Sequence, residues 1–151
     1  MTIRPATSVD LESMTALARE STSAAQWSEK EYRDLFSAQD PHRIALVADN
    51  TQSRGAGILG FLVARHVAPE WELENVVVAT SARRQGIGIQ LLNALIASTR
   101  ETNSDSVFLE VRESNVSARA LYEKSGFQPT GRRKSYYANP IEDAILYRLS
   151  L

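Results

Sequence analysis

Two glycines and two arginines stand together in the hexapeptide Arg83-Arg84-Gln85-Gly86-Ile87-Gly88. The hexapeptide follows a β-like run that ends at Val78 and opens a segment with the apolar period of a helix. Glycine lets the backbone turn tightly and approach a ligand, and the first amides of a helix have no partner within it. Such a site binds anions, phosphate above all. The hexapeptide therefore predicts a site for a phosphorylated cofactor, although glycines that only allow helix–strand packing give the same pattern.

A carboxylate lies in the middle of the next expected strand, residues 106–112. Strand alternation places Phe108, Glu110 and Arg112 on one face and apolar residues on the other. A carboxylate there is costly to bury unless it is paired or used. Glu110 is thus either half of an ion pair, with Arg112 or another basic neighbour, or a general base that opens into a cleft.

A tyrosine follows on the next expected helix. Asn115 is a plausible N-cap, the helix runs through Lys124, and Gly126 suits the residue that ends it. Ala118, Leu121 and Tyr122 occupy adjacent positions on one helix face. Tyr122 is either a core residue with a hydrogen-bonded hydroxyl or an acid that gives a proton to a leaving group.

Together these residues resemble the GCN5-related N-acetyltransferase (GNAT) superfamily over nearly the whole chain, most strongly from Val76 to Phe127. The stretch 109–127 is similar to a narrower group, the protein N-terminal acetyltransferases. Within that group it resembles the bacterial ribosomal-protein-alanine N-acetyltransferases (the RimI group). The segments 27–30 and 132–144 support this resemblance.

The resemblance implies acetyl-CoA as the co-substrate and the N-terminus of an acceptor protein, ribosomal in this group, as the partner. It implies that Glu110 is the general base and Tyr122 the general acid that protonates the departing CoA thiolate. The implied cofactor-binding residues are Val76, Val77, Val78, Arg83, Arg84, Gln85, Gly86, Ile87, Gly88, Ile89 and Asn115. The implied acceptor-binding residues are Trp27, Glu74, Asn75, Tyr136 and Tyr137, the two tyrosines in a loop that closes over the peptide.

Several alternatives stay open at this point. Glu72 or Glu74 could take the base role, because other GNAT enzymes place a base on that strand. Lys134-Ser135 lengthens the segment before the tyrosines relative to the RimI group, which puts the geometry of that loop in doubt. The acceptor could instead be a small-molecule amine or a lysine side chain, or the chain could bind acetyl-CoA without catalysis.

The elements that must position these residues follow the order β-α-α-β-β-β-α-β-α-β-β. This order predicts an α/β (α+β) fold, a mixed sheet covered by helices with a parallel crossover around the glycine loop. The resemblance implies the GNAT fold, a mostly antiparallel, twisted, seven-stranded sheet with about four helices. Its central parallel strands would splay to bind acetyl-CoA. We expect Ile89, Leu92, Leu95 and Ile96 to face the core, a hairpin loop at 50–57, and final strands at 127–132 and 143–149.

Size and composition exclude several classes of function. The 151 residues fit one domain, 1–151, and a net charge of −1 argues against a nucleic-acid binder. The chain has no cysteine and only two histidines, so we expect no disulfide and no metal. Without a signal-like segment or a membrane-length apolar run, we expect no membrane association and cytoplasmic residence. The oligomeric state stays open.

Overall fold

The computed structural model describes residues 1–21, 27–37, 42–50 and 57–151. Its strands are β1 (Thr2–Pro5), β2 (Arg43–Asp49), β3 (Ile58–Val67), β4 (Glu70–Val78), β5 (Ser106–Arg112), β6 (Gln128–Tyr137) and β7 (Glu142–Ser150). Its helices are α1 (Leu11–Glu20), α2 (Glu29–Asp34), α3 (Ile87–Arg100) and α4 (Val116–Lys124), with 3-10 turns η1 (Ser8–Asp10) and η2 (Thr80–Ala82). The predicted order of elements is confirmed.

Side-chain caps start two of these helices, and the N-cap predicted at Asn115 is confirmed. At α2, the Ser28 hydroxyl accepts the Glu31 amide at 3.1 Å, and the Glu31 carboxylate accepts the Ser28 amide at 3.3 Å. At α4, the Asn115 side chain accepts the Ala118 amide at 3.2 Å. Each cap satisfies an amide that the helix itself leaves without a partner.

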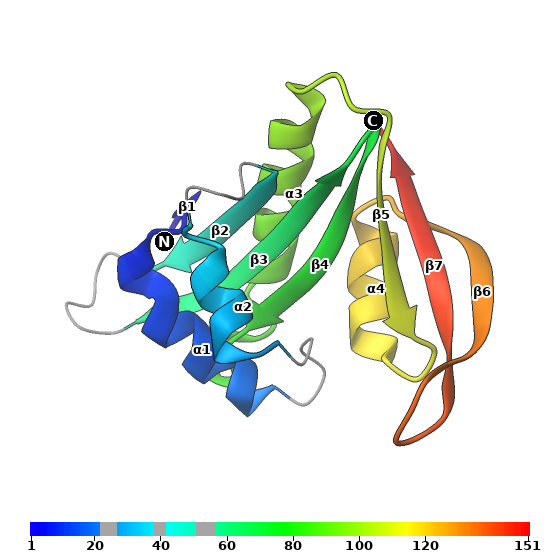
Figure 1. Ribbon diagram of the computed structural model, residues 1–151, viewed down its shortest axis with the longest axis horizontal. Coiled ribbons are helices and arrows are strands. Elements are labelled where there is room, and N and C mark those ends of the chain that lie inside the picture. The colour runs from blue at the N-terminus through cyan, green and yellow to red at the C-terminus, as the bar shows by residue number, and fades with distance from the viewer. Residues whose placement is uncertain (22–26, 38–41, 51–56) are drawn as a thin grey trace.

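The seven strands form one sheet in the order β1-β2-β3-β4-β5-β7-β6, and every neighbouring pair is antiparallel except β4 and β5. These two central strands are in register only where Glu70–Glu72 meets Ser106–Phe108. Beyond that point they diverge, so the sheet opens into a V between β4 and β5 (Figure 1). The expected GNAT fold with splayed parallel strands is confirmed.

Helices cover both faces of the sheet (Figure 1). On one face, α3 and α4 bury a core that includes Leu91, Leu95 and Tyr122. On the other face, α1 and α2 cover a second core that includes Met14 and Tyr32. We call these the α3/α4 face and the α1/α2 face. Among the described helices, none is long and apolar enough to cross a membrane.

A β-bulge in β4 moves side chains from one face to the other. Val63 of β3 lies opposite Asn75 and the next residue of β3 lies opposite Leu73, so Glu74 is the extra residue. Leu73 belongs to the α3/α4 core, whereas Val77, beyond the bulge, belongs to the α1/α2 core. The bulge therefore turns the end of β4 at the point where β4 and β5 part.

Two local predictions were wrong. Tyr136 and Tyr137 lie at the end of β6 rather than in a loop, because the strand continues through a bulge after Arg133. Ile89 is only half-buried, since the core face of α3 is centred on Ile87, Leu91, Leu92, Leu95 and Ile96. Most of the predicted hairpin loop, residues 51–56, lies outside the described residues.

Candidate functional site at the splay of β4 and β5

The segment before α3 has the backbone of an anion site. Arg84 and Gly86 take left-handed conformations, with φ of 65° and 76°, and α3 begins at Ile87. Residues 83–86 are exposed, and a Cβ built on Gly86 would meet nothing within 4 Å. Within the described residues, the amides from Arg84 to Ile89 donate no hydrogen bond. Free amides at the positive end of a helix suit a pyrophosphate.

The second glycine of the motif has a different role. Gly88 is buried, and a Cβ built on it would lie 3.0 Å from a terminal methyl of Leu121 on α4. This distance is tighter than an ordinary contact, so Gly88 lets α3 and α4 approach closely. Gly86 thus shapes the exposed loop, and the packing interpretation of the motif is confirmed for Gly88.

The last residues of β4 offer one unpaired backbone edge. Val76, Val77 and Val78 pair with β3 on one side, whereas the β5 side pairs only as far as Glu72. An extended ligand can hydrogen-bond to such an edge as an added strand would. The edge runs towards the loop at 83–86, so one elongated molecule could meet both.

Glu110 lies on the α1/α2 face of β5, since Val107, Leu109 and Val111 belong to the opposite core. Its side chain is 16% exposed, and its Oε1 lies 3.2 Å from Nε of Arg133. Tyr136 lies within electrostatic range, because the charge of Glu110 is the largest cause of its raised pKa. The ion-pair interpretation of Glu110 is therefore correct, but the partner is Arg133 rather than Arg112.

Two further carboxylates share this face. Glu74 is 12% exposed and is clamped by Arg43, whose Nε and Nη2 donate to it at 2.9 and 3.2 Å. Glu72 has a single contact with Arg65, at 3.1 Å. Burial raises the pKa of Glu72, and the charges of Glu74 and Glu110 raise it further. Two nitrogens of Arg43 thus hold Glu74, whereas Glu72 and Glu110 each contact a single arginine nitrogen.

Tyr122 belongs to the core of the α3/α4 face. It is buried, its ring packs 6.2 Å from that of Tyr147, and burial raises its pKa well above the ordinary value. Tyr137 is the next contributor to that shift, and the charge of Glu110 contributes to the raised pKa of Tyr137. Glu110 thus lies on the α1/α2 face and Tyr122 in the core of the α3/α4 face, and each acts electrostatically on Tyr137 or is acted on by it.

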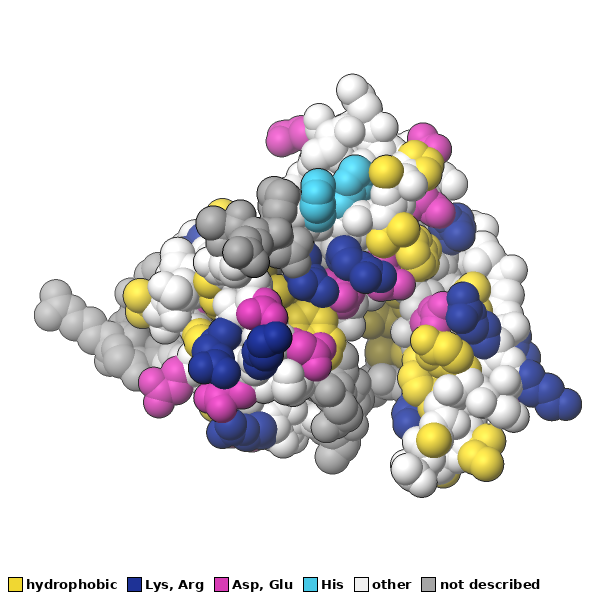
Figure 2. All heavy atoms as spheres, viewed as in Figure 1, with side chains coloured by type: hydrophobic (Ala, Val, Ile, Leu, Met, Phe, Trp, Pro, Cys, Tyr) yellow, Lys and Arg dark blue, Asp and Glu magenta, His cyan; other side chains and the backbone are white. Residues whose placement is uncertain are grey.

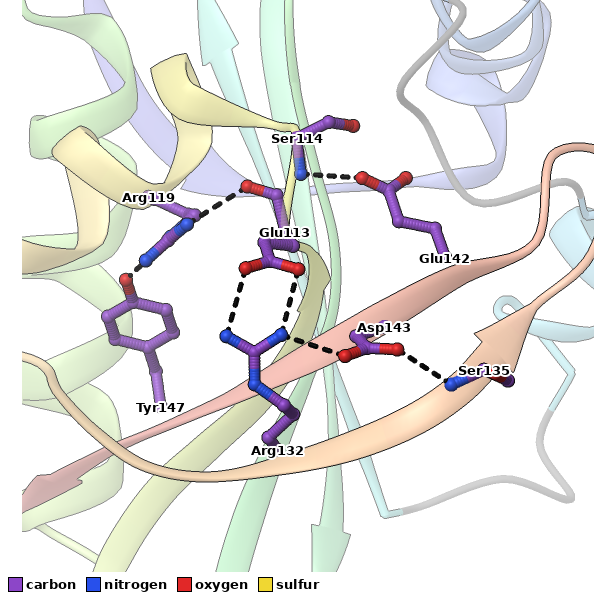
Figure 3. A network of polar contacts seen from close by, with 8 residues as sticks. All are labelled: Glu113, Ser114, Arg119, Arg132, Ser135, Glu142, Asp143 and Tyr147. Atoms are coloured by element: carbon purple, nitrogen blue, oxygen red, sulfur yellow. Dashed lines mark hydrogen bonds and ion pairs between the residues drawn. The ribbon is translucent and has the colours of Figure 1, made fainter.

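A polar network fixes the β6–β7 hairpin that carries the tyrosines (Figure 3). Arg132 donates to Glu113 at 2.8 and 2.9 Å and to Asp143 at 2.8 Å. The Ser135 amide donates to Asp143 at 2.8 Å, and the Ser114 amide donates to Glu142 at 2.7 Å (Figure 3). The residues Lys134 and Ser135, which lengthen this segment, form the bulge of β6.

The remaining acceptor candidates lie on the α1/α2 face. Asn75 is buried and donates to the Tyr32 hydroxyl at 3.3 Å, and the rings of Tyr32 and Trp27 are 5.2 Å apart. The guanidinium of Arg43 lies 5.5 Å from the Trp27 ring. Figure 2 shows this face hollowed between the part over β4 and the part over β6 and β7, with charged side chains on both rims.

Sequence reasoning missed three residues of this arrangement: Tyr32, Arg43 and Arg133. Tyr32 shares the capped helix that follows Trp27, and this spacing is the one signal for it in the sequence. The two arginines pair with carboxylates from distant strands, and no sequence spacing connects them. Among the described residues, no group of three His, Asp or Glu side chains is arranged to hold a metal ion.

Comparison with known proteins agrees with this geometry. The sequence model of the acetyltransferase (GNAT) family matches residues 11–127. The [ribosomal protein bS18]-alanine N-acetyltransferase of Escherichia coli is 34% identical over 131 residues, covering 85% of the chain and 83% of that protein. The enzyme of the same name from Haemophilus influenzae is 42% identical over 83 residues, which cover 55% of the chain and only 56% of that relative.

Solved structures show the same fold. The crystal structure of the ribosomal-protein-S18-alanine N-acetyltransferase from Escherichia coli has a TM-score of 0.78 at 29% identity, covering 99% of the chain and 92% of that protein. Arabidopsis thaliana NAA60 in complex with acetyl-CoA has a TM-score of 0.87 at 16% identity, covering 99% and 98%. At that identity the second likeness concerns the fold alone.

Proposed function

The chain belongs to the acetyltransferase (GNAT) family, and from this premise we propose that it transfers the acetyl group of acetyl-CoA to the N-terminal α-amine of an acceptor protein. The acceptor we propose is an alanine-type N-terminus of a ribosomal protein, met in the cytoplasm. Residues 1–151 act as one N-acetyltransferase domain. The observation that carries the proposal is the splay of β4 and β5, which leaves the edge of Val76–Val78 unpaired on the chain segment that leads to the free amides before α3.

Acetyl-CoA lies along the splay in this proposal. The free amides from Arg84 to Ile89 hold its pyrophosphate, and Arg83 and Arg84 add positive charge. The edge of Val76–Val78 pairs with the pantetheine arm. Asn115 lies across the splay at the start of α4 and contacts the cofactor there. The thioester then sits between Glu110 and Tyr122.

The reaction needs a neutral amine, a proton acceptor and a protonated leaving group. The amine nitrogen attacks the thioester carbonyl carbon, so an N–C bond forms and the C–S bond breaks. Glu110 takes the proton that the nitrogen loses, and Tyr122 gives its phenolic proton to the sulfur. Because burial raises the pKa of Tyr122, this hydroxyl keeps its proton throughout the neutral range until it is needed.

An α-amine suits this site better than a lysine side chain. Its ammonium form has a pKa of about 8, so roughly a tenth is already neutral at pH 7, whereas lysine titrates near 10. The carboxylates of Glu72 and Glu110 attract the cation, and Tyr136 and Tyr137 offer aromatic walls to an extended chain. Trp27 and Glu74 lie on the opposite side, next to the buried Asn75, and these three residues complete the proposed acceptor site. The names of the relatives point to the same class of acceptor.

Three peptides test the proposal: one that begins with alanine, one that begins with serine, and the alanine peptide with a blocked α-amine and an internal lysine. Mass spectrometry after incubation with acetyl-CoA should find acetyl on the α-amine of the first, less on the second, and none on the third. Undiminished acetylation of the blocked peptide at its lysine would refute the α-amine assignment. Ribosomal-protein N-termini compared in cells with and without the gene then identify the acceptor.

A further inference from the structure

Arg133 covers the solvent side of the Glu110 carboxylate. The Arg133 side chain is 56% exposed, whereas that of Glu110 is 16% exposed, so the guanidinium is the outer member of the pair. The same guanidinium lies 5.4 Å from the centre of the Tyr136 ring, and the charge of Glu110 raises the pKa of that tyrosine. A cation thus already stands beside the proposed base, on the side from which an acceptor would arrive.

The guanidinium of Arg133 makes fewer polar contacts than those of Arg132 and Arg112. Arg132 donates three hydrogen bonds to two carboxylates, and Arg112 donates three, one to a carboxylate and two to backbone carbonyls. Within the part of the chain that the structure describes, Arg133 has one single-nitrogen ion pair and one ring contact. Because more than half of the Arg133 side chain is exposed, water and salt screen this pair, and another cation can take the place of the guanidinium at small cost.

The backbone below Arg133 is nevertheless fixed. The bulge that follows it is held by the hydrogen bond from the Ser135 amide to Asp143, and Arg132 before it is bound to the same carboxylate. The guanidinium can therefore swing away while its Cα stays in place. The backbone of Arg133 is thus fixed, while its guanidinium has only weak contacts. Such a side chain can give up its place beside Glu110 to a cationic ligand.

We propose that Arg133 is the resident counter-ion of Glu110, and that the α-ammonium group of the acceptor displaces it on binding. The inference rests on the function proposed above. The exchange replaces one cation by another, so the recessed carboxylate keeps a partner throughout, which avoids the cost of a buried unpaired charge. An acceptor with a blocked, neutral amine gains no such replacement. Arg133 is in this sense a specificity-determining residue for cationic primary amines.

Kinetics with three variants test this inference. Arg133→Gln removes the charge at nearly constant length, Arg133→Lys keeps it, and Lys134→Gln removes a charge from the neighbouring residue as the matched control. Each is assayed with the alanine peptide and acetyl-CoA at low and high ionic strength. The Kd of the peptide, measured by calorimetry in the presence of CoA, gives a readout that does not depend on turnover.

Competition between Arg133 and the substrate predicts a specific pattern. Arg133→Gln should lower the peptide KM and Kd about two- to fivefold at low salt, as expected for a weak ion pair, with less change at high salt. Its kcat and its KM for acetyl-CoA should stay near those of the wild type, as should all constants of Arg133→Lys and Lys134→Gln.

Three results would overturn the inference: an unchanged or raised peptide KM in Arg133→Gln, a large fall in its kcat, or an equal effect from Lys134→Gln. A large fall in kcat that Arg133→Lys restores would instead make Arg133 a positioning residue for Glu110. If the wild-type protein fails to acetylate any free α-amine, the proposed function fails, and that outcome is distinct from these three.

Discussion

The backbone amide of Ser135 donates to the carboxylate of Asp143 at 2.8 Å, and this contact fixes the bulge that precedes Tyr136 and Tyr137. Ser135 has a φ of 53°, in the left-handed region that a non-glycine residue adopts only with support from its surroundings. The hydrogen bond from Ser135 is the largest cause of the lowered pKa of Asp143, and Arg132 is the next. The position of both tyrosines therefore depends on Asp143.

Asp143→Ala should loosen the tyrosines without touching the cofactor site. We expect the KM for the acceptor peptide to rise roughly tenfold, because small misplacements of positioning groups are costly, while the KM for acetyl-CoA stays unchanged. Glu113→Gln is the matched control, since Glu113 binds Arg132 but not Ser135. Steady-state kinetics on both variants measure the KM for the acceptor peptide. An equal rise in KM in both would show that Arg132, rather than Asp143, fixes the hairpin.

Glu72→Gln should make the folded chain more resistant to heat at pH 7. Burial raises the pKa of Glu72 in the folded state, so the folded chain holds a proton that the unfolded chain has already lost. The contribution of Glu72 to the free energy of unfolding therefore falls as pH rises from its pKa in the unfolded chain through its pKa in the folded chain. At neutral pH the folded chain still bears the cost of holding the ionised carboxylate. Glutamine carries no charge, so the Glu72→Gln variant does not bear this cost. The difference in Tm from the wild type should vanish at about pH 4 or below, where Glu72 is protonated in both the folded and the unfolded chain.

Thermal unfolding at pH 4 and pH 7 measures this difference in Tm. Arg65→Gln is the control, because it removes the cation that partly offsets the burial of Glu72. It should lower Tm at pH 7 and leave Tm at pH 4 nearly unchanged. A Tm of Glu72→Gln below that of the wild type at pH 7 would contradict the account.

Gly86→Ala and Gly88→Ala should fail in different ways. Gly86 has room for a methyl group but a left-handed backbone, so alanine costs about 1 kcal/mol of conformational strain. That strain should reshape the loop and weaken acetyl-CoA binding. At Gly88, a Cβ presses on Leu121, and overpacking of this kind costs roughly 1–3 kcal/mol of folding stability.

Denaturant unfolding and acetyl-CoA calorimetry on both glycine variants separate the two roles. Gly88→Ala should lose more free energy of unfolding than Gly86→Ala. Gly86→Ala should lose more affinity for acetyl-CoA, compared with its loss of stability, than Gly88→Ala. If the two variants behave alike, the division of labour between the glycines is wrong.

Periodicity and caps predicted nearly all the elements because local physics decides them. The alternation from Val107 to Val111 correctly placed Glu110 on the face away from the α3/α4 core, and Asn115 correctly began α4. The same alternation concealed the bulge at Glu74, since β4 reads as one regular strand although its two ends belong to different cores. A bulge is set by the pairing of two strands, and a single strand does not reveal it.

The sequence identified residues of the candidate site but not which of them contact one another. The ion pair of Glu110 was expected with Arg112 or another basic neighbour, and the structure shows that the partner is Arg133 on β6. Contacts between distant strands follow from the register of the sheet, which no motif records. The Tyr136–Tyr137 segment was placed in a loop for a similar reason, because Lys134 and Ser135 interrupt the strand pattern where the sheet absorbs them as a bulge.

The most direct test of the proposed chemistry is the kcat of Glu110→Gln and Tyr122→Phe with the alanine peptide. Glu74→Gln serves as the comparison, because Glu74 shares the face of Glu110 but is clamped by Arg43. Acetyl-CoA affinity should stay unchanged in all three variants. We predict that kcat falls about 10²- to 10⁴-fold in Glu110→Gln and Tyr122→Phe, and far less in Glu74→Gln. Full activity of Glu110→Gln and Tyr122→Phe, or a loss confined to Glu74→Gln, would contradict the assignment of base and acid.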